Sequence, residues 1–141
     1  MRHLLDVNVI VGALRADAPL HAPARAWLHG ATGAVLALPE TLAAAVRVLA
    51  NERIWAQVPT VDEATVAVND LIDGARISIA GSVPGAWPAF TAFVASGQLS
   101  HRDVPDALLA AQARAMDAEL VTFDRGFRNY PGLRVQILYP V

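Results

Sequence analysis

The sequence contains no cysteine, and each of its 11 basic side chains is an arginine rather than a lysine. Without cysteine the chain has no disulfides, no thiolate metal sites and no thiol nucleophile. Without lysine it has no phosphate-binding P-loop lysine and no lysine to form a Schiff base or act as a general base. Charged residues make up only 17% and the formal net charge is -2, so a uniformly basic surface for nucleic acid is also excluded.

Long apolar runs are missing as well. No stretch approaches the roughly 18 uncharged apolar residues of a membrane span, and the apolar start of the chain is interrupted by Asp6 and Asn8. We therefore expect a cytoplasmic protein that makes no membrane contact. With 55% hydrophobic residues, the chain can fill a core and is not a disordered tail. Its 141 residues suit one domain, 1–141.

Short apolar strands alternate with amphipathic helices, which is typical of an α/β protein with a parallel sheet covered on both faces. Asn8 is a candidate N-cap for the first helix, and Pro39 suits the first turn of a later one. The predicted strands are His3–Leu5, Ala34–Leu38, Arg76–Ile79, Glu119–Thr122 and Arg134–Leu138. The predicted helices are Asn8–Ala16, His21–His29, Pro39–Leu49, Val61–Ile72, Trp87–Val94 and Val104–Asp117.

Four acidic residues lie where these elements meet. Asp6 ends the first strand, Glu40 opens the helix after the second strand, Asp106 lies in the first turn of a later helix, and Asp124 follows the strand that ends at Thr122. In a parallel sheet the carboxyl ends of the strands and the amino ends of the helices share one edge, where ligands bind. We expect the four carboxylates to gather there.

Each acid also has a purely structural interpretation. Glu40 can complement a helix dipole, Asp106 can belong to a capping box with Asp103, and Asp124 can simply form a turn. Asp6 is harder to explain in this way, because a carboxylate directly after a buried strand is poorly solvated.

Carboxylates that converge repel one another and raise each other's pKa unless a cation is present. Ligands that are all oxygen, without cysteine or a suitably spaced histidine pair, favour Mg²⁺ or Mn²⁺ over Zn²⁺. Such ions suit the hydrolysis of phosphodiester bonds.

Four segments of the chain resemble PIN-domain ribonucleases, and most of all the VapC-like toxins of type II (VapBC) toxin–antitoxin systems. The segments are L-L-D-V-N-V-I, L-P-E-T-L with V-R-V-L, V-P-D-A-L-L-A-A-Q-A-R and V-T-F-D-R-G-F-R-N-Y-P-G-L. Only residues 56–100 are weakly patterned. The resemblance implies a single PIN-like α/β/α sandwich with a central parallel sheet, Mg²⁺-dependent endoribonuclease activity, and neutralisation by a cognate VapB-like antitoxin. We also expect a homodimer.

Carried over by position, the catalytic acids would be Asp6, Glu40, Asp106 and Asp124. The resemblance implies that Asp6, Asp106 and Asp124 hold the metal, while Asn8 and Thr122 support these acids by hydrogen bonds. Two departures stand out. Many relatives have a further acid where this chain has Gly126, and the segment around Glu40 matches more loosely than the others.

Arginines close to these acids in sequence are candidates for gripping RNA phosphates: Arg15, Arg102, Arg125, Arg128 and Arg134. For each of them, the competing interpretation is a solvated or ion-paired surface. Two further functions are compatible with the same residues: a non-catalytic PIN-fold module that binds protein or RNA, and a metal-dependent DNA nuclease. The residues do not identify the RNA that would be cut.

Overall fold

A five-stranded parallel sheet organises the chain, whose computed structural model describes residues 1–140. The strand order is β3-β2-β1-β4-β5, so β1 lies at the centre and pairs with both β2 and β4. The chain proceeds outward from β1 to β3 on one side and from β4 to β5 on the other, which makes the gap between β1 and β4 the point where strand order reverses. The strands are β1 (Arg2–Leu5), β2 (Ala34–Ala37), β3 (Ile77–Ile79), β4 (Ala118–Thr122) and β5 (Val135–Ile137).

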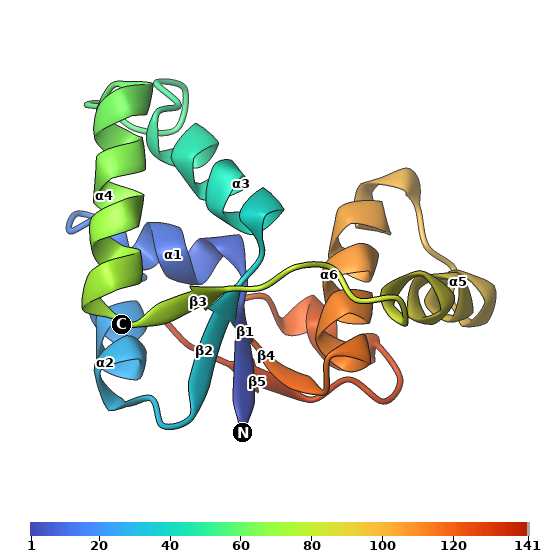
Figure 1. The fold of residues 1–141 in the computed structure, drawn as a ribbon. Helices are drawn as coiled ribbons and strands as arrows, with labels where there is room; N and C mark the ends of the chain where they lie inside the picture. The colour runs from blue at the N-terminus through green and yellow to red at the C-terminus, as the bar shows by residue number, and fades with distance from the viewer. Residues whose placement is uncertain (141) are drawn as a thin grey trace.

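Helices cover both faces of this sheet (Figure 1). One face carries α1 (Val7–Leu14), α2 (His21–Gly30), α3 (Pro39–Leu49) and α4 (Val61–Gly74). The other face carries α5 (Ala86–Ser96) and α6 (Val104–Ala115). Two short 3₁₀ helices, η1 (His101–Asp103) and η2 (Arg125–Asn129), precede α6 and follow β4. The predicted α/β/α sandwich with a central parallel sheet is therefore confirmed.

The sheet divides the interior into two cores, and β1 contributes to both. Leu5 packs among the residues of α1 to α4, whereas its neighbour Leu4 packs on the α5 and α6 side, and both are fully buried. Successive side chains of a strand point to opposite faces, so a central strand between two helical layers must be apolar throughout. Burial of each leucine contributes about 1.5–3 kcal/mol.

The start of α1 differs from the prediction that Asn8 caps it. Asp6 is the N-cap instead: its backbone is extended, and its Oδ1 accepts a hydrogen bond from the Val7 amide at 2.7 Å. Asn8 lies inside the first turn of α1, which ends at Leu14 rather than near Ala16. Asp6 takes the cap because it is the single residue between the end of β1 at Leu5 and the start of α1 at Val7.

Two further boundaries differ from the prediction for a common reason. Arg76 and Asp117 both have φ near +55°, in the left-handed region that ends a helix. Arg76 therefore separates α4 from β3 instead of starting the strand, and Asp117 lies beyond the end of α6 instead of within it. Within residues 1–140, no helix is both long and apolar enough to cross a membrane.

Candidate active site

Asp6 lies at the carboxyl end of the central strand, beside the point where strand order reverses. Leu5 is in register with Val121 of β4, so Asp6 follows directly beside Thr122. The Asp6 side chain is only 7% exposed. Its Oδ1 caps α1, and its Oδ2 accepts a hydrogen bond from the Thr122 hydroxyl at 2.7 Å. A carboxylate in this position is fixed in orientation and poorly hydrated.

The Thr122 hydroxyl is the centre of a small hydrogen-bond network. While its proton is donated to Asp6, its oxygen accepts from the Asp124 amide at 3.0 Å and from the Asn8 side-chain amide at 3.3 Å. A hydroxyl has one proton and two lone pairs, so this fully buried group is saturated. Asn8 also accepts from the Phe123 amide at 3.2 Å. Asn8 and Thr122 thus tie the start of α1 to the backbone that leads to Asp124.

Three carboxylates at this edge influence one another electrostatically. Burial raises the pKa of Asp6 above its usual range, the hydrogen bonds from Thr122 and Val7 oppose that rise, and the charge of Asp124 adds to it. Burial also raises the pKa of Asp106, from 3.8 to about 6, with further contributions from the charges of Asp6, Asp124 and Asp103. The structure therefore brings Asp6, Asp106 and Asp124 together, although they come from the end of β1, from α6 and from the segment after β4.

The capping interpretation of Asp106 is wrong, because the capping box lies one turn earlier. Asp103 pairs with Ser100: the Ser100 amide donates to Asp103 Oδ2 at 2.9 Å, and the Asp103 amide donates back to the Ser100 carbonyl at 3.0 Å. Asp106 therefore does not cap α6, and it lies half-buried in the first turn of this helix. Sequence reasoning also missed Asp103 as a source of negative charge at the site. The Ser100-x-x-Asp103 spacing was the signal that identifies the cap.

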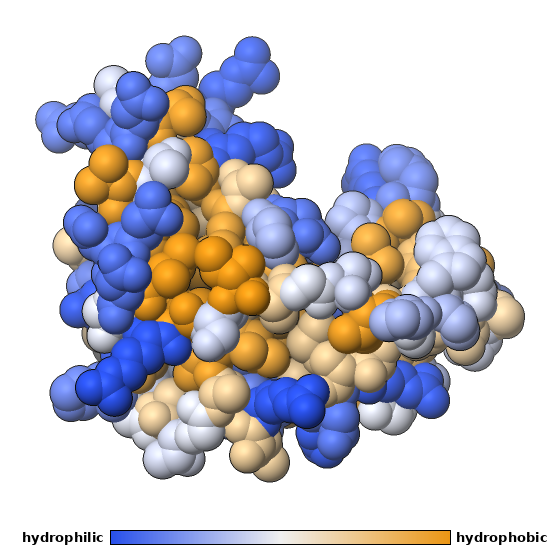
Figure 2. Space-filling model, viewed as in Figure 1, coloured by the Kyte–Doolittle hydropathy of each residue, from blue (hydrophilic) through white to orange (hydrophobic). Residues whose placement is uncertain are grey.

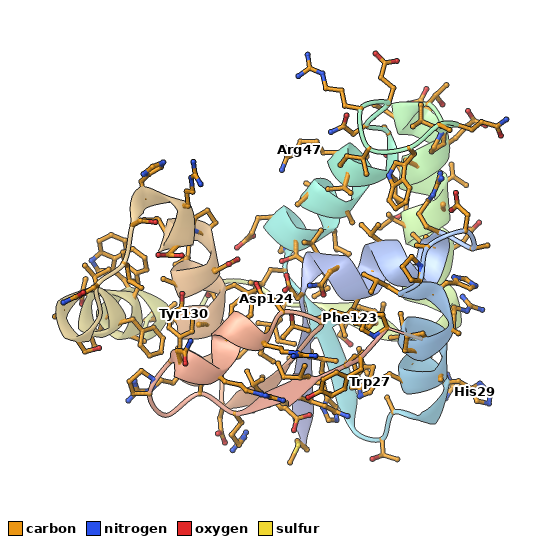
Figure 3. All side chains as sticks on the ribbon, turned by 180° about the vertical axis from the view of Figure 1, so that it is seen from behind. Trp27, His29, Arg47, Phe123, Asp124 and Tyr130 are labelled. Atoms are coloured by element: carbon orange, nitrogen blue, oxygen red, sulfur yellow. The ribbon has the colours of Figure 1, made fainter. Side chains whose placement is uncertain are left out.

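Asp124 serves both as a turn residue and as a member of the carboxylate group. Its Oδ1 accepts from the Gly126 amide at 2.8 Å and so caps η2, while its side chain is exposed. Figure 3 shows it between the first turns of α1 and α6. A Cβ at Gly126 would lie 3.1 Å from this oxygen, so glycine leaves room that a side chain would restrict.

Glu40 occupies the first turn of α3, after β2, and is exposed. It lies at the same edge of the sheet, but it is not among the charges that raise the pKa of Asp6 or Asp106. Its position also suits the helix dipole. Figure 2 shows a hollow in the molecular surface between the lobe that contains α3 and the lobe of α5 and α6. Arg47 projects from α3 on the side of this hollow (Figure 3).

The predicted RNA-binding arginines fall into two groups. Arg15 lies at the far end of α1 from Asp6, where its guanidinium pairs with Asp17 at 2.6 Å and lies over the Trp55 ring. Arg134 precedes β5, at the opposite edge of the sheet, and pairs with Asp117 at 3.0 Å. The ion-paired interpretation thus describes both of these residues. The three others are exposed near the carboxylates: Arg102 on η1, and Arg125 and Arg128 on η2.

The donor set at this edge has the chemistry of a site for a hard cation. It consists of carboxylate oxygens supported by a hydroxyl and an amide, without imidazole or thiolate. Within residues 1–140, however, no three Asp, Glu or His side chains are drawn together tightly enough to hold one ion as they stand. Burial, and then the charges of neighbouring carboxylates, raise the pKa values of Asp6 and Asp106, and a bound cation would lower them.

A groove of about 1100 Å³ lies elsewhere, between α2 and α4. It is lined by apolar residues such as Leu14 and Leu71, with Arg25, Arg76 and Asp70 among its polar residues. Of residues 1–140, Asp70 is the one carboxylate that lines this groove, whereas several carboxylates gather at the carboxyl edge of the sheet.

Comparisons with known proteins agree with this architecture. The chain is 32% identical over 133 residues to VapC ribonuclease Mb2897 of Mycobacterium bovis, covering 92% of this chain and 90% of that protein. It is 29% identical over 143 residues to ribonuclease VapC29 of Mycobacterium tuberculosis, covering 99% and 98%. Among solved structures, VapBC2 of Rickettsia felis, bound to a DNA fragment from its promoter, has a similar fold with a TM-score of 0.71 at 14% identity, covering 98% and 99%.

The family model described as the PIN domain matches residues 3–133, which include Asp6, Glu40, Asp106 and Asp124 and the helices and strands that position them. The chain therefore belongs to the PIN domain family.

Proposed function

We propose that this protein is a Mg²⁺-dependent endoribonuclease toxin that a cognate VapB-like antitoxin neutralises. The observation that carries the proposal is the gathering of Asp6, Asp106 and Asp124 at the switch point of the sheet, where burial and then the neighbouring charges raise the pKa of Asp106 to about 6. Carboxylates arranged in this way are stabilised by a cation. The choice of RNA as substrate is supported by the relatives, which are named as VapC ribonucleases.

Asp6, Asp106 and Asp124 would hold Mg²⁺ or Mn²⁺, and Glu40 would assist from α3. When bound, the ion would supply Lewis-acid chemistry, neutralising charge on the scissile phosphate and making an attacking water more acidic. The chain's own contribution is orientation. Thr122 holds the Asp6 carboxylate by a 2.7 Å hydrogen bond, and Asn8 and Thr122 hold the backbone at Phe123 and Asp124. Side chains held this way keep a bound ion and a phosphate in a constant geometry.

The VapB-like antitoxin is proposed because solved structures with this fold are toxin–antitoxin complexes, including VapBC2 of Rickettsia felis and VapBC of Salmonella typhimurium. A homodimer stays a prediction. Size-exclusion chromatography with light scattering, on the chain alone and after co-expression with the antitoxin, measures both assemblies.

The test is cleavage of total RNA by the purified protein, freed of any partner, with Mg²⁺ and then with EDTA. We expect cleavage only with Mg²⁺, and we expect Asp6→Asn to abolish it while the variant remains folded. Asp70→Asn, which removes an exposed carboxylate from α4, is the matched control and should cut like the wild type. Mapping the RNA ends after induced expression would identify the cut site.

Cleavage by Asp6→Asn near the wild-type rate would refute the site, and RNA binding without any cleavage would favour a non-catalytic module. Cleavage of DNA but not RNA would favour a DNA nuclease.

A further inference from the structure

Two arginines of η2 meet one exposed aromatic ring at the carboxyl edge of the sheet. The Arg128 Nη2 donates a hydrogen bond to the Tyr139 hydroxyl at 2.6 Å, and the Arg125 Cζ lies 5.3 Å from the centre of the same ring. We call Arg125, Arg128 and Tyr139 the Tyr139 patch. The contact joins a segment that directly follows Asp124 to a residue two positions beyond β5.

The position of the patch follows from the sheet. Strands β4 and β5 are parallel neighbours, with Thr122 in register with Ile137. The residues that follow both strands therefore emerge at one edge, which is also the edge of Asp6 and Asp124. The Tyr139 patch thus borders the proposed active site on the β5 side.

Within the part of the chain that the structure describes, no carboxylate neutralises the charges of the patch. Among residues 1–140, no carboxylate lies within 4.0 Å of the guanidinium of Arg125 or of Arg128. Only one of the five N–H donors of Arg128 is used by Tyr139, which orients the group and leaves the others available. Two guanidiniums beside one ring repel each other, and an anion placed between them would relieve that repulsion. A phosphate diester matches the fork of a guanidinium.

Part of the Tyr139 surface remains open to solvent, although Arg125 lies over the ring. Tyr139 is 50% exposed although two side chains hold it, so part of its surface faces solvent. A tyrosine held in one orientation and open to solvent is the platform that single-stranded nucleic acids use for a base. A base in a duplex is already stacked and paired, and it cannot reach such a platform.

We propose that the Tyr139 patch binds an unpaired nucleotide next to the scissile phosphate, with its base stacked on Tyr139 and its phosphate held by Arg125 and Arg128. This inference rests on the proposed function, since it assumes that RNA reaches the neighbouring carboxylates, but the two can be tested separately.

The experiment measures binding in EDTA, where cleavage plays no part. The full chain is titrated against a fluorescein-labelled single-stranded oligoribonucleotide of mixed sequence, and anisotropy is followed at several NaCl concentrations. Loss of a stacked base is worth about 1–3 kcal/mol, so Tyr139→Ala should weaken binding by about 5-fold or more. Tyr139→Phe keeps the ring and should stay within about 3-fold of the wild type, corresponding to loss of one hydrogen bond.

The arginine variants test the phosphate contact. Arg125→Ala and Arg128→Ala should each lower the slope of log affinity against log salt by about 0.7. The matched control is Arg53→Ala, which removes the same charge from an exposed position beyond the far end of α3 and should leave the slope unchanged. Unlabelled duplex RNA is added as a competitor for the labelled strand. Its affinity should be the same for the wild type and for Tyr139→Ala, because the duplex does not use the ring. Urea denaturation confirms that each variant is folded.

Four results would overturn the inference: no RNA binding by the wild type, Tyr139→Ala binding within 2-fold of it, Tyr139→Phe as weak as Tyr139→Ala, or salt slopes equal to that of Arg53→Ala. Binding of an acidic peptide to the patch in preference to RNA would assign it to a protein partner and would also contradict the proposal. Cleavage of RNA with Mg²⁺ is scored in parallel. Absence of cleavage by the wild type in that assay refutes the proposed function, whereas normal cleavage with unchanged binding by the variants refutes only the patch.

Discussion

Replacing Asp106 with asparagine is expected to make the protein more stable at pH 8 in EDTA, although it removes a proposed metal ligand. The reason is the pKa of Asp106, which burial and three neighbouring acids raise from 3.8 to about 6. Below pH 3.8 the carboxyl is protonated in both the folded and the unfolded chain. Between about pH 3.8 and 6 the unfolded chain ionises this carboxyl while the folded protein keeps it protonated, so stability falls over that range, and the loss is complete above pH 6.

The size of the effect follows from the same values. Each pKa unit corresponds to about 1.4 kcal/mol, so the full rise is worth about 3 kcal/mol. Asp106 is only half-buried, and solvent screens part of this energy, which leaves about 1–1.5 kcal/mol. Asparagine has nearly the same shape and no charge, so Asp106→Asn should gain about this much at pH 8 and much less at pH 4.

Urea denaturation in EDTA at pH 4 and pH 8 measures this gain for the wild type, for Asp106→Asn and for Asp70→Asn, which removes a charge from α4 in the other helical layer. Only Asp106→Asn should show a gain that grows with pH. Added Mg²⁺ should then narrow the difference at pH 8, because a cation relieves the repulsion in the wild type. A gain of equal size at both pH values, or a loss at pH 8, would refute the electrostatic reasoning.

Three further predictions concern the stability of the protein and its RNA cleavage activity. Thr122→Val keeps the shape but removes a saturated buried hydroxyl, so unfolding in urea should require about 1–3 kcal/mol less, whereas Thr122→Ser should stay close to the wild type. Gly12→Ala would place a Cβ 2.9 Å from the Cβ of Leu20, and this overpacking between α1 and α2 should cost about 1–3 kcal/mol in the same assay. Arg134→Ala, which breaks an exposed pair with Asp117 at the other edge of the sheet, should leave RNA cleavage kinetics unchanged; a large loss of activity would contradict this assignment.

The layout of the fold was predictable because its periodicity is strong. Apolar strands of a few residues alternate with amphipathic helices, and parallel strands need such helical connections. The predicted boundaries are wrong at junctions, where the conformation of a single residue sets the end of a helix or the start of a strand. Arg76 and Asp117 adopt left-handed backbone conformations that nothing in their residue types announces, and the cap of α1 is Asp6, a residue that the sequence favoured as a metal ligand.

The convergence of Asp6, Asp106 and Asp124 was also predictable, since a parallel sheet brings strand ends together. The supporting role of Asn8 and Thr122 was expected only from the resemblance, and their individual hydrogen-bond partners were not predictable from the residues. Thr122 reaches Asp6 only because β1 and β4 pair in one particular register. The contact of Arg128 with Tyr139 likewise depends on how η2 folds back over the end of β5, which no local pattern specifies.

The central pairing of the sheet has a consequence for synthesis. Leu5 of β1 is in register with Val121 of β4, so the two strands cannot pair until the ribosome has made the chain through β4. Ribosomes release a chain from its amino terminus onward, and the first helical layer can form while the carboxyl-terminal third is still missing. Asp106 and Asp124 join Asp6 only after that. On the proposed function, the growing chain therefore lacks the full set of these carboxylates until β4 and the residues after it have been made.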